Sequence, residues 1–197
     1  MAYTIVGLGN PGEEYKGSRH NSGRMAVESF AEEQTFPPFL PRNRRAKALV
    51  SAGSIGKETV TLLLPETFMN RSGSAVAPFV KSKKQAQRLI VVYDDLDLPL
   101  GKLKISFGRS SGGHRGVESV ARALRTKDFA RVRLGIARAR ARGGLDKPKG
   151  EDAVVAYLMA PFGARERRVL AAALARASGA LLAIVKDGTA RAMNEFN

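Results

Sequence analysis

Apolar stretches and amphipathic stretches alternate along the chain, and each kind predicts a different element. Continuous apolar stretches bounded by glycine or polar residues are typical of buried strands, whereas strict alternation is typical of strands with one solvated face. Leu103–Phe107 and Arg131–Ile136 alternate in this way. The predicted strands are Tyr3–Val6, Ala48–Ser51, Thr59–Leu64, Leu89–Tyr93, Leu103–Phe107 and Arg131–Ile136.

Apolar residues spaced three or four positions apart predict helices between and after these strands. The first helix has its apolar residues within 26–31 and begins near Asn21 or Ser22, whose side chains suit an N-cap. The other predicted helices are Ser74–Lys81, Gly116–Leu124, Asp152–Met159 and Gly163–Lys186. Glycine, lysine and proline are frequent in 140–150, which predicts a mobile loop.

Strands that alternate with helices indicate the α/β fold class. We expect a single domain over residues 1–197, built as a three-layer sandwich in which a mixed twisted sheet carries helices on both faces. The length of 197 residues and the hydrophobic share of 44% suit one such core.

Composition excludes several classes of protein. The chain contains no cysteine, so disulfides, thiolate zinc sites and a cysteine nucleophile are excluded. No uninterrupted apolar run approaches the roughly 20 residues of a membrane span. Residues 1–6 lack the basic start of a signal peptide. We therefore expect a cytoplasmic protein without a membrane partner.

The net charge of +15, from 33 basic and 18 acidic residues, favours a polyanionic partner. The basic residues cluster at 42–47, at 81–84, along 131–142 and at 165–168, which favours nucleic acid over a general solubility bias. Charge alone does not separate tRNA from DNA, ribosomal RNA or an anionic membrane.

Two glycine motifs resemble known sites without the context that those sites need. Gly7–Gly12 matches the GxGxxG dinucleotide pattern, but the residues that follow it carry no apolar helical stripe. Gly108–Gly112 matches GxSxG, but the one histidine beyond Ser110 is His114, which precedes any candidate acid. We expect loops with functional side chains and free backbone N–H groups instead of an NAD site or a serine triad.

The acidic run Asp94-Asp95-Leu96-Asp97 follows a predicted strand. It lacks the ligand spacing of known Mg²⁺ or Ca²⁺ sites, so we expect no metal there and interpret the carboxylates as groups that solvate and cap the strand end.

Acid–base chemistry near neutral pH has two histidine candidates, His20 and His114. Each lies in a polar loop, where a capping or hydrogen-bonding role is equally open. The ends of parallel strands meet at one edge of a sheet, so Asn10, Asn70 and Asp94 are expected to converge there with His20. A carboxylate beside an imidazole fixes its tautomer, and amides can bind a water and a carbonyl.

The chain resembles bacterial-type peptidyl-tRNA hydrolases in several blocks that occur in order from end to end. The blocks are Val6–Gly12 with Tyr15, Arg19–Gly23, Pro65–Asn70 with Ser72-Gly73, Asp94–Pro99 with Gly101-Lys102, Ser110–Gly116 and Ala192–Asn197. The resemblance implies a monomeric enzyme that hydrolyses the ester between peptide and tRNA, without cofactor or metal. It recycles tRNA that leaves ribosomes prematurely, and transient contact with the ribosome is open.

The resemblance also implies roles for individual residues. His20 is expected to act as general base on water, with Asp94 holding it and Asn10 reading the substrate near the ester. The expected substrate and tRNA contacts are Tyr15, Phe68 and Asn70 in the cleft, His114 and Arg115 in the glycine turn, and Lys104 and Arg133 on acceptor-stem phosphates.

One position departs from the family pattern. Its usual Gly-Gly-His-Asn-Gly turn is Gly112–Gly116 here, with Arg115 in place of asparagine. Arginine only donates hydrogen bonds and adds charge, so Arg115 either binds a phosphate or carbonyl or turns out of the cleft. A non-catalytic RNA-binding protein on the same scaffold is the alternative function, because a pure binder needs the basic surface but not His20 and Asp94.

Overall fold

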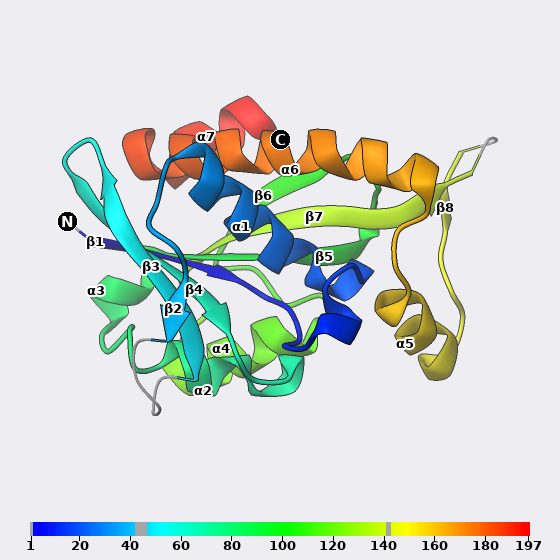
Figure 1. Cartoon of the computed structure of the whole chain (residues 1–197), viewed down its shortest axis with the longest axis horizontal. Coiled ribbons are helices and arrows are strands. Elements are labelled where there is room, and N and C mark those ends of the chain that lie inside the picture. The colour runs from blue at the N-terminus through cyan, green and yellow to red at the C-terminus, as the bar shows by residue number, and fades with distance from the viewer. Residues whose placement is uncertain (1, 42–46, 141–142) are drawn as a thin grey trace.

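The computed structural model describes residues 2–41, 47–140 and 143–197, and a mixed sheet runs through its centre (Figure 1). In the described chain the order across the sheet is β2-β3-β4-β1-β5-β7-β6, with β8 paired to β7. The strands are β1 (Ala2–Gly7), β2 (Leu40–Pro41), β3 (Ala48–Ile55), β4 (Glu58–Pro65), β5 (Leu89–Pro99), β6 (Leu103–Phe107), β7 (Ala130–Ala139) and β8 (Leu145–Asp146).

The four central strands β4, β1, β5 and β7 run parallel to one another, while β2, β3, β6 and β8 pair antiparallel at the margins. The carboxyl ends of β4, β1 and β5 therefore lie side by side. This edge is where an open α/β sheet collects ligands.

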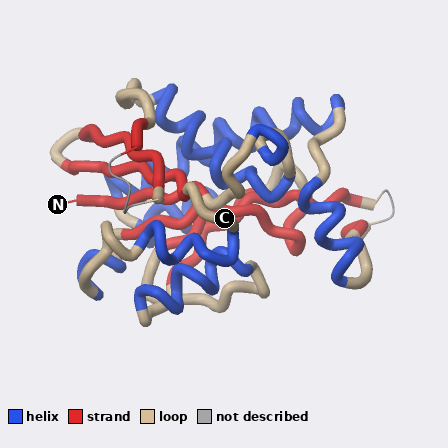
Figure 2. Tube along the Cα trace, turned by 60° about the horizontal axis from the view of Figure 1, so that its bottom comes forward, coloured by secondary structure: helices blue, strands red, loops and turns tan. Residues whose placement is uncertain are grey.

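Helices cover both faces of the sheet, so the predicted fold class is confirmed (Figures 1 and 2). On one face lie α1 (Ser22–Glu33), α6 (Ala164–Asp187) and α7 (Thr189–Phe196); on the other lie α2 (Ser72–Val76), α3 (Lys83–Ala86) and α4 (Arg115–Leu124). Each face of the sheet has its own hydrophobic core, and alternate side chains of β5 belong to one or the other. Ile90 and Val92 pack with α1 and α6, whereas Val91 and Tyr93 pack with α4.

The helix α5 (Glu151–Met159) differs from the others because none of its residues is buried. It lies beyond the end of the sheet (Figure 1) and contacts the short 3₁₀ turn η2 (Arg19–Asn21), which follows another such turn, η1 (Glu13–Tyr15). The Tyr157 hydroxyl donates to the carbonyl of Ile136 at 2.7 Å, which fastens the helix to β7.

Several elements differ from the sequence prediction: β3 and β7 are longer than expected, and β2, β8 and α3 were not predicted. The strand β5 continues past Tyr93 to Pro99, because Asp94 and Asp95 still pair with β7 before a shift in register. The interpretation of 94–97 as a strand cap was therefore wrong. The helix expected at 74–81 shortens to α2, and α7 was missed because its eight residues follow α6 after only Gly188.

The long helix α6 is long and apolar enough to pass as a membrane span, because an 18-residue window within it has a mean hydropathy of 1.7, although no apolar run in the sequence indicated one. Its buried residues, among them Ala177, Leu181 and Ile184, pack against α1 and the sheet. This is the position of a core helix. Of the residues in 140–150, two lie outside the described residues, and the expected mobility of the loop stays a prediction.

Gly23, at the start of α1, lets this helix touch the central sheet. A Cβ atom on Gly23 would lie 2.2 Å from the backbone oxygen of Val92 in β5. This close approach places His20, three residues before Gly23, beside Asp94, two residues after Val92. The packing of one glycine thus sets the geometry of the cleft.

We predict that Gly23→Ala destabilises the fold by about 2 kcal/mol or more, because backbone must move to admit the methyl group. Gly17→Ala is the matched control: its Cβ would meet nothing within 4 Å, so a change within about 0.5 kcal/mol is expected. Urea unfolding measures both. Equal losses of stability in the two variants would contradict the packing role of Gly23.

Candidate functional site

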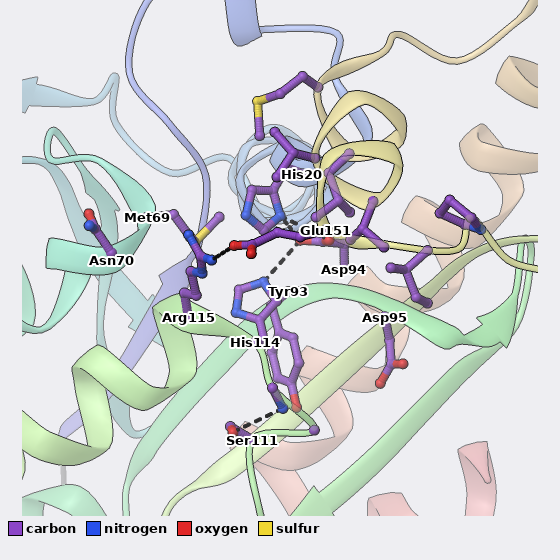
Figure 3. A pocket seen from close by; sticks show the side chains of 18 of the residues that line it. His20, Met69, Asn70, Tyr93, Asp94, Asp95, Ser111, His114, Arg115 and Glu151 are labelled. Carbon is purple, nitrogen blue, oxygen red and sulfur yellow. Dashed lines mark hydrogen bonds and ion pairs between the residues drawn. The ribbon is translucent and has the colours of Figure 1, made fainter.

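A cavity of about 670 Å³ opens at the carboxyl edge of the central strands (Figure 3). Asn10, His20, Asn70 and Asp94, which the sequence placed near one another, all line it. Its far wall comes from α5 and the loop before it, including Lys147, Val154, Leu158 and Met159. The cavity therefore lies between the sheet edge and the loosely packed helix.

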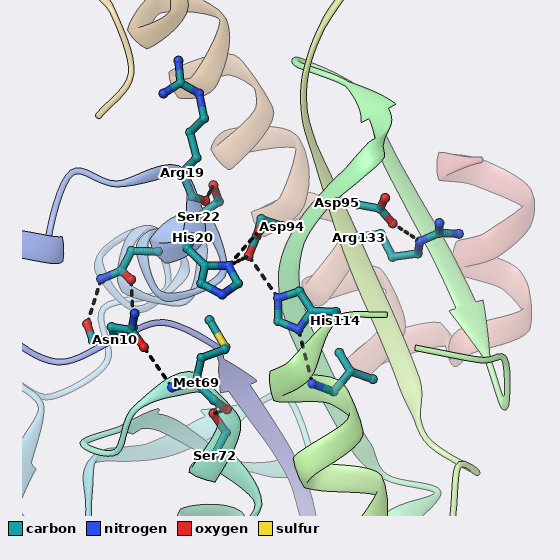
Figure 4. A network of polar contacts seen from close by, with 12 residues as sticks. Asn10, Arg19, His20, Ser22, Met69, Ser72, Asp94, Asp95, His114 and Arg133 are labelled. Atoms are coloured by element: carbon teal, nitrogen blue, oxygen red, sulfur yellow. Dashed lines mark hydrogen bonds and ion pairs between the residues drawn. The ribbon is translucent and has the colours of Figure 1, made fainter. Parts of the chain in front are cut away.

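His20 and Asp94 form a buried pair on the floor of this cavity (Figure 4). Nδ1 of His20 lies 2.9 and 3.0 Å from the two carboxylate oxygens of Asp94. A carboxylate only accepts, so Nδ1 carries the proton and Nε2 keeps its lone pair. Among the described residues no group hydrogen-bonds that Nε2, which leaves it available as a base.

His114 donates to the same carboxylate from the other side. Its Nε2 lies 3.1 Å from an oxygen of Asp94, and its Nδ1 accepts the N–H of Val117 at 3.3 Å, capping α4. Both ring nitrogens are used, and the accepting Nδ1 fixes the Nε2–H tautomer. His114 is thus a second donor to Asp94, while His20 holds the available nitrogen.

The charges around the pair favour an ionised aspartate and a basic imidazole. Burial by itself would raise the pKa of Asp94, but His20 and His114 hold it well below its usual range. Burial also lowers the pKa of His20, yet the charge and hydrogen bond of Asp94 outweigh it and raise that pKa above 6.5, with Arg115 opposing the rise. His20 is therefore strengthened as a base.

The side chain of Asn10 is oriented by the loop after β4. Its Oδ1 accepts the backbone N–H of Met69 at 2.8 Å, a group that can only donate. The amide nitrogen Nδ2 must then face the cavity, where the sulfur of Met159 lies 3.9 Å away. Asn10 presents a hydrogen-bond donor to whatever enters.

Arg115 lies on the rim of the cavity instead of its floor. Its guanidinium forms an ion pair with Glu151 at the start of α5, and both side chains are largely exposed. Lys147 pairs with Asp97 across the same opening. Of the two alternatives for Arg115, the structure places it on the cleft wall but bonded to another side chain.

The aromatic and amide residues expected in the cleft divide into two groups. Phe68 and Asn70 line the cavity. Tyr15 is not among the residues that line it; its ring packs against that of Phe68, with ring centroids 6.4 Å apart, edge to face. A contact of Tyr15 with the substrate stays a prediction.

The expected phosphate contacts lie outside this cavity. Lys104 and Arg133 are cross-strand partners on β6 and β7, so they share the sheet face that α4 partly covers. Lys104 is exposed, but Arg133 donates to Asp95. A phosphate at Arg133 would have to compete with that carboxylate.

The basic clusters that the sequence indicated differ in their exposure to solvent. Residues 42–46 lie outside the described residues, whereas Arg165, Arg167 and Arg168 are exposed on α6. Arg131 is fully buried, which corrects the expectation that the whole stretch 131–142 forms a basic surface. Alternation on β7 turns its side chain beneath α4.

Comparison with known proteins places this fold and site in a family. The model of the family described as peptidyl-tRNA hydrolase matches residues 4–197. The chain belongs to the peptidyl-tRNA hydrolase family. The peptidyl-tRNA hydrolases of Carboxydothermus hydrogenoformans and Chloroflexus aggregans are each 40% identical to it, over 99% of this chain and 98% of theirs. The family resemblance inferred from the sequence is confirmed.

The solved structures agree with this assignment. The crystal structure of peptidyl-tRNA hydrolase from Acinetobacter baumannii is similar with a TM-score of 0.87 at 30% identity, covering 100% of this chain and 94% of that one.

Two residues that position the site of this peptidyl-tRNA hydrolase were not singled out from the sequence. Asn21 accepts the backbone N–H of Asn10 at 2.8 Å and donates to its carbonyl at 3.0 Å. Arg19 is buried and donates to the carbonyls of Ala160 and Pro161 and to Glu166, which fixes the end of α5 to the His20 loop. Both stand beside His20 in the block 19–23, and this proximity was the available signal.

His20, Asp94 and His114 also form a group of potential metal ligands, whose donor atoms lie within 4.8 Å of one another. The nitrogen–oxygen distances of 2.9–3.1 Å are those of hydrogen bonds, and each facing nitrogen carries the proton that Asp94 accepts. A metal would need both protons removed. These three side chains therefore satisfy one another through hydrogen bonds, without a metal ion.

We predict that Arg115→Asn raises the pKa of His20, because it removes a cation that disfavours the imidazolium and leaves Glu151 unpaired nearby. Arg115→Lys keeps the charge and serves as the control, with a pKa close to the original. NMR titration of the His20 ring protons measures both. A lowered pKa in Arg115→Asn would contradict this electrostatic account.

Proposed function

We propose that this chain hydrolyses the ester that joins the peptide to tRNA, with His20 as the general base. Its family membership makes it a hydrolase of peptidyl-tRNA. The observation that carries the mechanism is the geometry of His20, whose Nδ1 is committed to Asp94 while Nε2 is directed to no other described group. The base and its orienting carboxylate are thus arranged before substrate binds.

In the proposed reaction Nε2 of His20 takes a proton from water as the water oxygen attacks the ester carbonyl carbon. Asp94 stabilises the imidazolium that forms, and His114 keeps the carboxylate in place. The bond between the carbonyl carbon and the ribose oxygen then breaks. The imidazolium returns its proton to the ribose oxygen, giving free peptide and tRNA.

Asn10 supplies discrimination in this proposal. Its amide nitrogen donates, so it suits an acceptor such as the carbonyl of a blocked amino group. The free α-ammonium of an aminoacyl-tRNA is itself a donor and offers nothing to accept this bond. Phe68 and Asn70 lie on the same wall, where they can contact the terminal adenosine.

The partner in this proposal is the acceptor stem and 3′ end of peptidyl-tRNA, released prematurely from ribosomes. The net charge of +15 suits that polyanion, and Lys104 and Arg133 remain proposed phosphate contacts. We further propose that the enzyme acts as a cytoplasmic monomer without cofactor or metal, and that any contact with the ribosome is transient.

A non-catalytic RNA-binding role is less well supported. Such a role would not need a buried aspartate shared by two histidines with one ring nitrogen left available. Hydrolysis of N-acetylaminoacyl-tRNA by the purified chain separates the two functions directly.

We predict that His20→Ala lowers kcat by about 10²–10⁴-fold, because a positioned base is lost. The dissociation constant for the tRNA is expected to change little, since the basic surface is intact. Release of labelled N-acetylaminoacyl acid from its tRNA and filter binding measure the two effects. Wild-type turnover in this variant would refute the role of His20.

The rate is also predicted to depend on pH in a defined direction. Neutral His20 is the active form and its pKa is raised, so kcat/KM should fall as the pH drops through a value above 6.5. Asp94→Asn should move this limb to lower pH and reduce the plateau, because the charge that raises the pKa is gone. Profiles that coincide for the two proteins would contradict the proposed coupling.

A further inference from the structure

A second cavity, of about 430 Å³, lies along α4 and shares Ser111 with the first cavity. Its basic side chains are Arg122 and Arg125 from α4, Lys127 from the following loop and Arg131 from β7. Glu118 is the carboxylate among the lining residues, and it accepts the hydroxyl of Ser111 at 2.9 Å. Four cations against one carboxylate make this cavity strongly positive.

Arg131 at this cavity is buried without a counter-charge. Its side chain has no solvent exposure, and among the described residues no carboxylate forms an ion pair with it. One nitrogen donates to the carbonyl of Lys127 at 3.4 Å, while Nε and Nη1 have no hydrogen-bond partner. Its guanidinium carbon lies 4.6 Å from the ring centroid of Phe129, and this cation–π contact offsets part of the cost of burial. The positive charge itself is neutralised by no carboxylate of the described residues.

The backbone conformation of Arg125 also favours a binding site at this cavity. This residue ends α4 in the left-handed conformation, at φ 52°, where glycine would be unstrained. A long cationic side chain is kept there instead, on the rim of the cavity. Strain of this kind is often retained at binding sites.

We propose that Arg122, Arg125 and Lys127 bind a backbone phosphate of the RNA substrate, with Arg131 as a fixed positive charge beneath them. This inference rests on the proposed function, which supplies the RNA. The exposed side chains make the contacts, and the buried guanidinium adds attraction that water does not screen. Ser111 lines both cavities, so a polyanion bound here is continuous with the catalytic cleft.

The subsite is separate from the expected contacts Lys104 and Arg133. Arg131 and Arg133 share one face of β7, but Arg133 is already paired with Asp95. Of these two arginines, Arg131 is the one whose charge no described carboxylate neutralises. A phosphate on this face is therefore drawn to Arg131 more strongly than to Arg133.

The test uses the double variant Arg122→Gln/Arg125→Gln with N-acetylaminoacyl-tRNA as substrate. KM is expected to rise about tenfold with kcat maintained, and the slope of log KM against log salt should fall by one to two. Lys186→Gln/Arg191→Gln removes the same charge from the opposite layer, outside the basic clusters, and is the control. An unchanged KM, or an equal rise in the control, would overturn the subsite.

Two further measurements separate the possible failures. Turnover of N-acetylaminoacyl-adenosine by the wild-type chain, a substrate without stem phosphates, tests the proposed function alone. Arg131→Met preserves side-chain bulk and removes the buried charge, so it should raise KM while Tm is maintained or rises. A lowered Tm with unchanged KM would assign Arg131 to the fold and overturn its part in the subsite; if this variant does not fold, the exposed pair decides.

Discussion

The geometry of the candidate site depends on one buried carboxylate that accepts hydrogen bonds from two histidines. Asp94 receives Nδ1–H of His20 and Nε2–H of His114. These opposite tautomers give the rings different tasks, although the chain has only these two histidines. Nδ1 of His114 accepts the backbone N–H of Val117 at the start of α4. The helix, the carboxylate and His20 are therefore held as one unit.

The sheet makes this arrangement possible because β5 continues beyond the predicted strand end. Alternation places Asp94 on the α1 side, where the tight contact of Gly23 with Val92 brings His20 to it. Asp95 points to the other face and meets Arg133. The one strand thus holds the proposed base through Asp94 on one face and contacts Arg133 through Asp95 on the other.

Much of the fold followed from local pattern, and the convergence of Asn10, His20, Asn70 and Asp94 followed from the rule for parallel strand ends. What the sequence did not indicate depends on tertiary contacts that spacing does not encode. The ring of Tyr15 packs edge to face against Phe68, and Arg115 pairs with Glu151, which lies 36 positions further along the chain. The burial of Arg131 beneath α4 could not be predicted either. An alternating pattern shows that a strand has two different faces, but it does not show which element covers each face.

The central claim is that His20 and His114 donate from opposite ring nitrogens, Nδ1 and Nε2, to one ionised aspartate. The most direct test is ¹⁵N NMR of the two imidazoles near pH 8, where just two histidine spin systems need assignment. We expect His20 protonated on Nδ1 and His114 on Nε2. A His20 ring protonated on Nε2 would leave no lone pair facing the cleft and would contradict the account.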